Sequence, residues 1–313
     1  MRIAIVKLSA LGDIVHAMVV LQFIKKNIPD IEINWVIEEK YFGLIKFNPH
    51  INKITVVNIR NAKQNKSLFM LYKELNRIRK LGYFDLVIDM QGLIKSALIS
   101  RLIPSTFTVG FDKLSIRERP ASFFYNKKFK YDYDKNVIER NIALISFAID
   151  IDIPKSEVDS KLAFLYHEQF MHNDYLSKSK KNVLLIPGAS NKVKCYPVSK
   201  LAKLASLIDA NIIVIWGNSE EKKLANYIKT KVPKTRVTSS LLIEELIMLV
   251  SQVDLVIGSD TGPTHMAWAL NVASIALFGP TPGYRNAYAS KINKVIESNS
   301  KVNPLRIDKK DDS

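Results

Sequence analysis

Short apolar runs and amphipathic stretches alternate along most of the chain. In the first half, runs typical of buried strands occur at 2–8, 32–37, 53–59 and 85–90. Most are followed by a stretch with helical periodicity or helical length, at 14–26, 41–47, 67–81 and 93–102. Strands that recur after helical crossovers indicate βαβ units and a parallel sheet.

The alternation breaks once and then restarts. Residues 107–135 are aromatic and basic and predict a long functional loop, followed by a helix at 136–149. Residues 150–161 are polar and contain Pro154, which makes them the best candidate for a linker. Beyond it, strands are expected at 182–187, 211–216, 255–258 and 273–278, and helices at 197–208, 219–229, 243–251 and 263–270.

Two successive doubly wound units predict an α/β protein with two Rossmann-like domains, 1–158 and 159–313, that face a cleft. In such sheets ligands bind beyond the carboxyl ends of the strands. The polar tail at 308–313 is expected to be disordered.

The charge balance adds a constraint on the partner. The chain has 46 Lys and Arg against 30 Asp and Glu, a net charge of +16. This favours an anionic partner, such as nucleic acid, a phosphorylated small molecule or an acidic membrane surface. The alternative is a lysine-rich face that serves only to keep the protein soluble.

Cysteine usage and the N-terminus narrow the class further. The single cysteine, Cys195, excludes an intramolecular disulfide and an all-cysteine metal site. Lys7 and Asp13 interrupt the apolar N-terminal residues, which therefore fit neither a signal peptide nor a membrane span. We expect a cytoplasmic enzyme that can reach the inner face of a membrane.

The sequence GSDTGPTH at 258–265 joins a strand to a helix and is the first candidate site. Thr261 is suited to cap the helix, and Gly262 allows close approach of a ligand to the backbone. The helix N-terminus then favours an anion such as phosphate. An ordinary capped turn would account for Thr261, but it leaves Asp260 and His265 unexplained.

Two further loops follow strands. In IPGASNKVKCYP, at 186–197, Ser190 and Lys194 are candidates to hold a phosphate, although the segment by itself favours a solvated lysine loop. In KLSALGDIVH, at 7–16, Asp13 stands where a helix starts. It is either an N-cap or a fixed base that accepts a proton from a hydroxyl.

Other familiar signals are weak. No G-x-G-x-x-G follows the first strand, and no Walker A sequence is present, so a dinucleotide or P-loop site is not predicted. Two Asp-x-Asp tripeptides, at 132–134 and 150–152, lie in the predicted loop and linker rather than at strand ends. The five histidines lack ligand spacing, so we predict no metal site.

Five segments together resemble the lipopolysaccharide heptosyltransferases, type I more than type II. They are KLSALGDIVHA at 7–17, FDLVIDMQGLIKSAL at 84–98, the lysine loop ending in KCYP, WGNSEEKKLA at 216–225 and GSDTGPTHMAWAL at 258–270. The resemblance covers nearly the whole chain in the right order. It implies the GT-B fold, with an acceptor-binding domain at 1–158 and a nucleotide-sugar donor domain at 159–313.

The resemblance also implies a reaction. L-glycero-D-manno-heptose would pass from ADP-heptose to a Kdo residue of Kdo-lipid A, with inversion and without a metal or cofactor, in inner-core synthesis. The partners would be those two substrates and the anionic inner-membrane surface, not nucleic acid. The protein would be cytoplasmic and peripheral to that membrane.

Roles for individual residues follow from the same resemblance. Asp13 matches the catalytic base, and Lys194 matches a lysine that contacts the donor phosphates and aids departure of ADP. Further donor contacts are implied for Ser190, Leu241, Asp260, Thr261, Gly262 and His265. The ribose-binding glutamate is Glu220 or Glu221, because the spacing departs from the family pattern. The acceptor contact is Arg117 or Arg119.

Two alternatives stay open. One is heptosyltransferase II or another GT-B glycosyltransferase, which would take a different acceptor. The other is a basic nucleic-acid-binding protein, although the sequence has no helix-turn-helix, RRM or KH signature.

Overall fold

The computed structural model describes residues 1–59, 65, 67–168, 174–299 and 302. The chain divides into two compact units, Met1–Lys161 and Leu162–Ser313. The tail at 308–313 lies outside the described residues.

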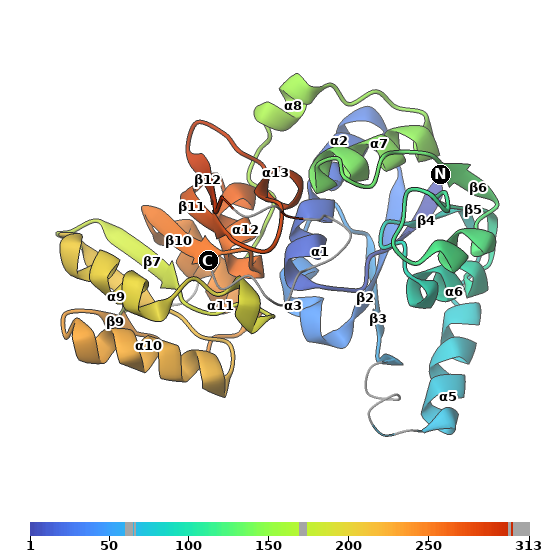
Figure 1. Cartoon of the computed structure of the whole chain (residues 1–313). Helices are drawn as coiled ribbons and strands as arrows, with labels where there is room; N and C mark the ends of the chain where they lie inside the picture. The colour runs from blue at the N-terminus through green and yellow to red at the C-terminus, as the bar shows by residue number, and fades with distance from the viewer. Residues whose placement is uncertain (60–64, 66, 169–173, 300–301, 303–313) are drawn as a thin grey trace. The chain divides into compact units, whose positions relative to one another are not determined.

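The first unit is built on a six-stranded parallel sheet of order β3-β2-β1-β4-β5-β6 (Figure 1). Its strands are β1 (Arg2–Val6), β2 (Glu32–Glu38), β3 (Lys53–Val57), β4 (Phe84–Asp89), β5 (Ser105–Phe111) and β6 (Lys127–Phe129). Its helices are α1 (Leu11–Met18), α2 (Val20–Asn27), α3 (Phe42–Ile45), α5 (Leu68–Arg79), α6 (Ile94–Leu102), α7 (Val137–Ile149) and α8 (Lys155–Asp159). Short 3-10 turns, η1 (Glu39–Tyr41) and η2 (Arg119–Phe124), join them.

One expectation for this unit was wrong, and another needs detail. The region 107–135 is not one long loop, because β5 overlaps it and β6 lies within it, and both strands belong to the sheet. The 3-10 turn η2 lies between them. β5 buries only Thr108–Phe111. This run is too short to stand out as a strand in a region that is otherwise aromatic and basic. The linker at 150–161 also contains a short helix, α8, which begins after Pro154.

The second unit repeats the architecture with the order β12-β11-β10-β7-β8-β9, again all parallel. Its strands are β7 (Asn182–Ile186), β8 (Asn211–Val214), β9 (Arg236–Val237), β10 (Leu255–Ser259), β11 (Ala273–Phe278) and β12 (Asn293–Glu297). Its helices are α9 (Val198–Leu207), α10 (Ser219–Lys231), α11 (Ile243–Gln252), α12 (Gly262–Ala269) and α13 (Gly283–Asn286), with a 3-10 turn η3 (Lys192–Lys194). The elements β9, β12 and α13 were not predicted from the sequence.

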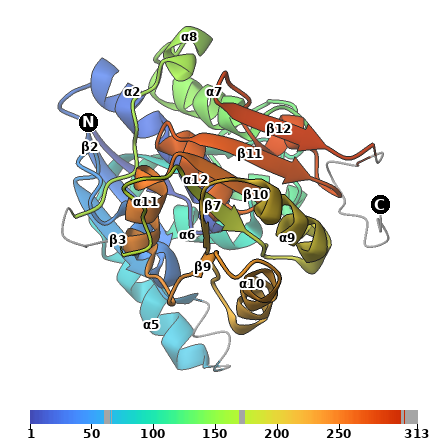
Figure 2. The same ribbon diagram turned by 90° about the vertical axis from the view of Figure 1, so that its left-hand side faces the viewer.

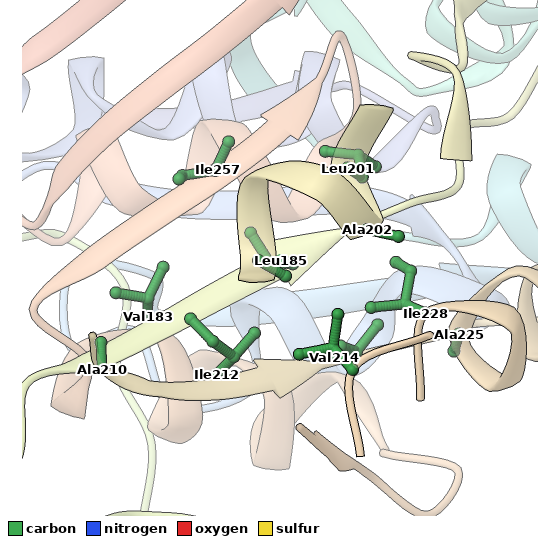
Figure 3. Packing of buried hydrophobic residues seen from close by; sticks show 12 residues of the cluster. Val183, Leu185, Leu201, Ala202, Ala210, Ile212, Val214, Ala225, Ile228 and Ile257 are labelled. Atoms are coloured by element: carbon green, nitrogen blue, oxygen red, sulfur yellow. The ribbon is translucent and has the colours of Figure 1, made fainter. Parts of the chain in front are cut away.

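Buried aliphatic side chains hold the helices of the second unit on its sheet. Figure 2 shows α9 and α10 on one side of the sheet and α11 and α12 on the other. On the α9 and α10 side, Leu185 and Val214 of the strands pack with Leu201 and Ile228 of the helices, all at most 1% exposed (Figure 3). Burial of apolar surface on this scale is the main stabilising term for such a layer.

The α/β class with two doubly wound parallel sheets is therefore confirmed. Both sheets share one strand order, in which the first strand of the unit lies beside the fourth. The order reverses between β1 and β4 in one unit and between β7 and β10 in the other, and ligands bind at such reversal points. Among the described helices, none is long and apolar enough to cross a bilayer.

Candidate functional site

The carboxyl edge of the second sheet brings two predicted residues together at its reversal point. Lys194 follows β7 and Asp260 follows β10, and these two strands are neighbours in the sheet. The ammonium Nζ of Lys194 lies 2.7 Å from Oδ2 of Asp260. Two loops separated by 66 residues therefore share one ion pair, as expected when both follow adjacent parallel strands.

Asp260 is the centre of a buried polar cluster. Its residue is 8% exposed, and its carboxylate has three side-chain partners. Besides Lys194, Nε2 of His265 lies 3.1 Å from Oδ1, and the hydroxyl of Thr281 donates to Oδ2 at 2.9 Å. Thr281 follows β11, the next strand of the sheet, and sequence analysis missed it because its segment GPTPG carries no charge.

These partners keep the Asp260 carboxylate ionised. Burial by itself would raise its pKa, because desolvation penalises the charged form. The hydrogen bond and charge of His265, together with the charge and hydrogen bond of Lys194, outweigh burial and hold the pKa of Asp260 well below its ordinary value. The cluster thus fixes a negative charge that orients two cationic or donor side chains.

The lysine loop after β7 is anchored to the neighbouring strand. The hydroxyl of Ser259, the last residue of β10, accepts the backbone N–H of Tyr196 at 3.0 Å. The side chain of Lys194 is 16% exposed, whereas that of Lys192 is 88% exposed. Ser190 lies exposed on the same loop, outside the Asp260 cluster.

Helix α12 begins directly after Asp260. Thr261 is its N-cap, as predicted, with extended backbone angles, but its side chain makes no capping hydrogen bond. Gly262 is the first helical residue. Gly258 has to be a glycine because an added Cβ would lie 2.6 Å from Oγ1 of Thr264 and 2.9 Å from Cβ of Ile186. Close packing of α12 on β7 and β10 thus sets where the helix N-terminus points.

The structure separates the two candidate glutamates. Glu221 accepts the backbone N–H of Gly217 at 2.7 Å through Oε2, and its side chain packs against Gly188, which follows β7. Glu220 has a side chain that is 56% exposed and pairs with Lys223 on the surface of α10. Glu221 therefore faces the loop edge of the sheet.

Leu241 lies at the same edge. It is half-buried in the connection from β9 to α11, two residues before that helix begins.

In the first unit, Asp13 lies just beyond the end of β1, but it is not the N-cap. Helix α1 starts at Leu11, Ala10 is the N-cap, and Asp13 is its third helical residue. The exposed carboxylate accepts the backbone N–H of Ala10 at 3.2 Å through Oδ2. The helix begins earlier than expected because Ala10 has an extended backbone and Leu11 and Gly12 already have helical geometry.

A buried turn after β4 contacts the loop between β1 and α1, the helix that contains Asp13. Gln91 accepts backbone N–H groups of that loop, and Asp89, which is fully buried, holds the turn. Burial raises the pKa of Asp89, opposed by hydrogen bonds from Tyr125, Gln91, Ser96 and Gly92. The roles of Asp89 and Gln91 were not predicted from the sequence, although Asp-x-Gln-Gly at the end of a buried strand is itself a turn signal.

The two candidate acceptor arginines follow β5, one before η2 and one at its start. Arg117 and Arg119 are both exposed, and Arg119 is the first residue of η2. Between them, Glu118 accepts the backbone N–H of Ile94, the first residue of α6, at 2.8 Å. That bond ties the segment to the turn after β4, and both arginines remain predictions.

The Asp-x-Asp tripeptides lie away from these edges. Their aspartates are exposed, one pair between β6 and α7 and the other between α7 and α8. Over the described ranges, no group of three or more His, Cys, Asp or Glu side chains is gathered closely enough to hold a metal ion.

Sequence and structure comparisons agree on the relationship. The family model for glycosyltransferase family 9 (heptosyltransferase) matches residues 73–311. Lipopolysaccharide heptosyltransferase 1 of Campylobacter coli is 41% identical, over 99% of this chain and 94% of that one. Its counterpart in Pseudomonas aeruginosa is 30% identical, over 92% of this chain and 81% of that one.

Among solved structures, Escherichia coli heptosyltransferase WaaC with ADP has a TM-score of 0.80 at 23% identity, over 98% of this chain and 95% of that one. The E. coli ADP-heptose LPS heptosyltransferase II has a TM-score of 0.72 at 19% identity, over 95% and 90%. These likenesses confirm the GT-B fold. With the family model and the close relatives, they show that the chain belongs to glycosyltransferase family 9 and is a glycosyltransferase of the lipopolysaccharide heptosyltransferase type.

Proposed function

We propose that this enzyme transfers L-glycero-D-manno-heptose from ADP-heptose to a Kdo residue of Kdo-lipid A, with inversion and without a metal ion. The observation that carries the proposal is the Lys194–Asp260–His265 cluster at the reversal point of the second sheet. Two solved structures are described as WaaC with ADP and WaaC with ADP-2-deoxy-2-fluoro heptose. These ligands support the choice of donor. The names of the curated relatives support the pathway.

In this proposal the second unit holds the donor diphosphate. Lys194 uses one N–H on Asp260, and an ammonium has three donors, so two can turn to phosphate oxygens. The N-terminus of α12 at Thr261 and Gly262 adds a partial positive charge of roughly +0.5. Negative charge grows on the diphosphate as ADP leaves, and donors fixed in advance stabilise that charge most.

Asp260 then acts chiefly by holding Lys194 and His265 in place. Its carboxylate carries three side-chain contacts, so little of its hydrogen-bonding capacity is left for sugar hydroxyls. Its negative charge is offset by Lys194, which limits repulsion of the diphosphate. We assign the ribose hydroxyls to Glu221 and the adenine contact to Leu241. Ser190, exposed on the loop after β7, is assigned as a further hydroxyl contact to the phosphates.

The first unit supplies the base. One oxygen of Asp13 is engaged by Ala10, and the exposed carboxylate can accept the proton of the attacking Kdo hydroxyl. The new bond joins that hydroxyl oxygen to the anomeric carbon while the bond to the diphosphate breaks, which inverts the configuration. Arg117 and Arg119, both exposed, suit the phosphates and carboxylates of the acceptor.

We further propose that the enzyme works on the cytoplasmic face of the inner membrane as a peripheral protein. The acceptor is a lipid that carries phosphates and carboxylates. A net charge of +16 favours encounter with such an anionic surface.

The decisive experiment is incubation of the enzyme with ADP-heptose and Kdo-lipid A, followed by assay of ADP release and of a one-heptose mass increment on the acceptor. The Asp13→Asn variant is the control for residual chemistry. A preference for an already heptosylated acceptor would instead indicate type II activity. Salt-dependent binding to random RNA with no transfer would favour the nucleic-acid alternative.

A further inference from the structure

The side chain of Gln91, from a distant part of the chain, contacts the loop between β1 and α1, and Asp13 lies in the first turn of that helix. Oε1 of Gln91 accepts the backbone N–H of Leu8 at 2.8 Å and that of Ser9 at 3.1 Å. Nε2 of the same amide lies 3.4 Å from the hydroxyl of Ser9. A single amide therefore engages two consecutive residues beyond the end of β1. The carbonyl of Leu8 also accepts the backbone N–H of Glu38, the last residue of β2, at 3.3 Å.

Gln91 is itself fixed by a buried carboxylate. Oδ1 of Asp89 accepts the backbone N–H groups of Gln91 at 2.8 Å and of Gly92 at 3.1 Å. Gly92 has a φ of +70°, and an added Cβ there would lie 2.7 Å from Ile116. The turn is thus sterically as well as electrostatically defined, and only glycine fits its last position.

The other carboxylate oxygen ties this turn to the rest of the unit. Oδ2 of Asp89 accepts hydrogen bonds from Ser96 at 2.8 Å and from Tyr125 at 2.7 Å. All three residues are at most 3% exposed. Tyr125 packs on Gly110, where an added Cβ would lie 2.4 Å from the ring. A buried polar network that is fully satisfied is rigid, because breaking any bond leaves an unpaired group in a low dielectric.

The connection to the exposed carboxylate is short. Ala10 follows Ser9, and its backbone N–H is the group that Asp13 accepts at 3.2 Å. Its carbonyl accepts the N–H of Ile14 at 2.9 Å, so the same residue starts α1. A shift of Ser9 would therefore move both the start of the helix and the carboxylate.

We propose that Gln91 is a positioning residue: its side-chain amide clamps Leu8 and Ser9 and thereby sets where the Asp13 carboxylate stands. Asp89 and Tyr125 are the buried anchor of that clamp. The inference rests on the proposed function, since it takes Asp13 as the catalytic base. It goes beyond that function by assigning catalytic precision to a residue that need not contact either substrate.

The test compares two substitutions at one position. Gln91→Met keeps the length of the side chain but removes the acceptor, whereas Gln91→Glu keeps an oxygen that both N–H groups can reach. Gln91→Met should lower kcat by about 10- to 100-fold, the scale of a small displacement of a reacting group, and leave donor KM unchanged. Gln91→Glu should recover most of that loss. Amide hydrogen exchange at Leu8 and Ser9 should quicken only in Gln91→Met.

Asn52→Ala is the matched control. It removes an amide oxygen that accepts the backbone N–H of Ile33 at 2.9 Å, in the same unit but at the amino ends of β2 and β3. Its kcat should equal that of the wild type. If Gln91→Met does not fold, Gln91→Asn, with an amide one methylene too short, replaces it.

Three results would overturn the clamp: an unchanged kcat in Gln91→Met, equal losses in Gln91→Met and Gln91→Glu, or unchanged exchange at Leu8 and Ser9. Failure of the proposed function is a separate observation, namely no heptose transfer by the wild type or full activity of Asp13→Asn. In both of these cases, amide hydrogen exchange at Leu8 and Ser9 still tests directly whether Gln91 holds the loop.

Discussion

The ammonium of Lys194 lies 2.7 Å from Oδ2 of Asp260, and the two residues come from opposite sides of the point where the second sheet reverses its strand order. The pair is partly exposed on the lysine side, at 16%, and nearly buried on the aspartate side, at 9%. Such an arrangement holds a cation at the mouth of the sheet while its counter-charge stays fixed behind it. The lysine is then directed toward a ligand before the ligand arrives, which lowers the cost of ordering it.

The first prediction compares two lysines of one loop. Lys194→Ala should weaken ADP-heptose binding by about 10- to 100-fold, since a hydrogen bond to a charged group contributes about 1.5–3 kcal/mol. It should also lower kcat, because charge on the diphosphate grows toward the transition state. Lys192→Ala is the control, as that side chain is 88% exposed and lies 3.9 Å from Glu220. Isothermal titration and steady-state rates of both variants test this prediction. Equal, small effects of Lys194→Ala and Lys192→Ala would mean that the diphosphate binds elsewhere.

The second prediction concerns stability in acid. The folded pKa of Asp260 is below its ordinary value of 3.8, so the folded state binds fewer protons there than the unfolded state does. Its contribution is present above pH 3.8 and is lost as the pH falls below that value toward the folded pKa. Wild-type stability should therefore fall more steeply than that of Asp260→Asn below about pH 4, where carboxyls titrate. Urea unfolding of both proteins from pH 5 downward measures this, and a constant difference between them would contradict it.

The third prediction separates Glu221 from Glu220. Glu221→Gln should lower affinity for ADP, because its carboxylate faces the loop edge beside Gly188, and should leave kcat at saturating donor little changed. Loss of one charged hydrogen bond corresponds to about a tenfold effect. Glu220→Gln should bind ADP like the wild type, since its partner is the surface residue Lys223. Titration of ADP into both variants tests the assignment, which a stronger effect at Glu220 would reverse.

Much of the fold and of the donor-side cluster was predictable from the sequence. Lys194 and Asp260 could be expected to meet because parallel strands bring all their carboxyl ends to one edge, whatever the separation along the chain. β1, β4, β7 and β10 are mostly apolar, so their positions were clear within one or two residues.

The elements that escaped prediction have weak local signals. β9 has only two residues, and β6 reads KKF, so neither shows a run of apolar positions. Both are specified by pairing with a neighbouring strand rather than by their own composition.

Asp13 and Thr281 illustrate a different limit. Aspartate is among the preferred N-cap residues, but an acid at the third helical position can also stabilise the helix start by accepting the N-cap N–H, as Asp13 does. Sequence cannot distinguish the two when the helix starts with Leu-Gly. Thr281 joins the cluster only because β11 lies beside β10, a tertiary fact with no trace in the segment itself.

The fourth prediction concerns metal ions. Transfer should proceed at an unchanged rate in excess EDTA, because Lys194 and the N-terminus of α12 meet the charge on the leaving diphosphate. The measurement is ADP release with and without EDTA and after readdition of magnesium or manganese. An absolute requirement for either ion would overturn the proposal and return attention to the exposed aspartates at 132–134 and 150–152.

The last prediction tests Asp13 with a substitution that preserves its structural contact. Asp13→Asn keeps a side-chain oxygen that can accept the N–H of Ala10, so α1 and the thermal stability should be retained. It removes the proton acceptor, and loss of a general base lowers turnover by about 10²- to 10⁴-fold. ADP affinity should be unchanged, since the proposed nucleotide contacts all belong to the second unit. Asp13→Ala is the complementary variant, which should lose both turnover and some stability. If Asp13→Asn transfers heptose at the wild-type rate while Asp13→Ala is merely less stable, the carboxylate serves only to start the helix, and the base must be sought among the other side chains at the carboxyl edge of the first sheet.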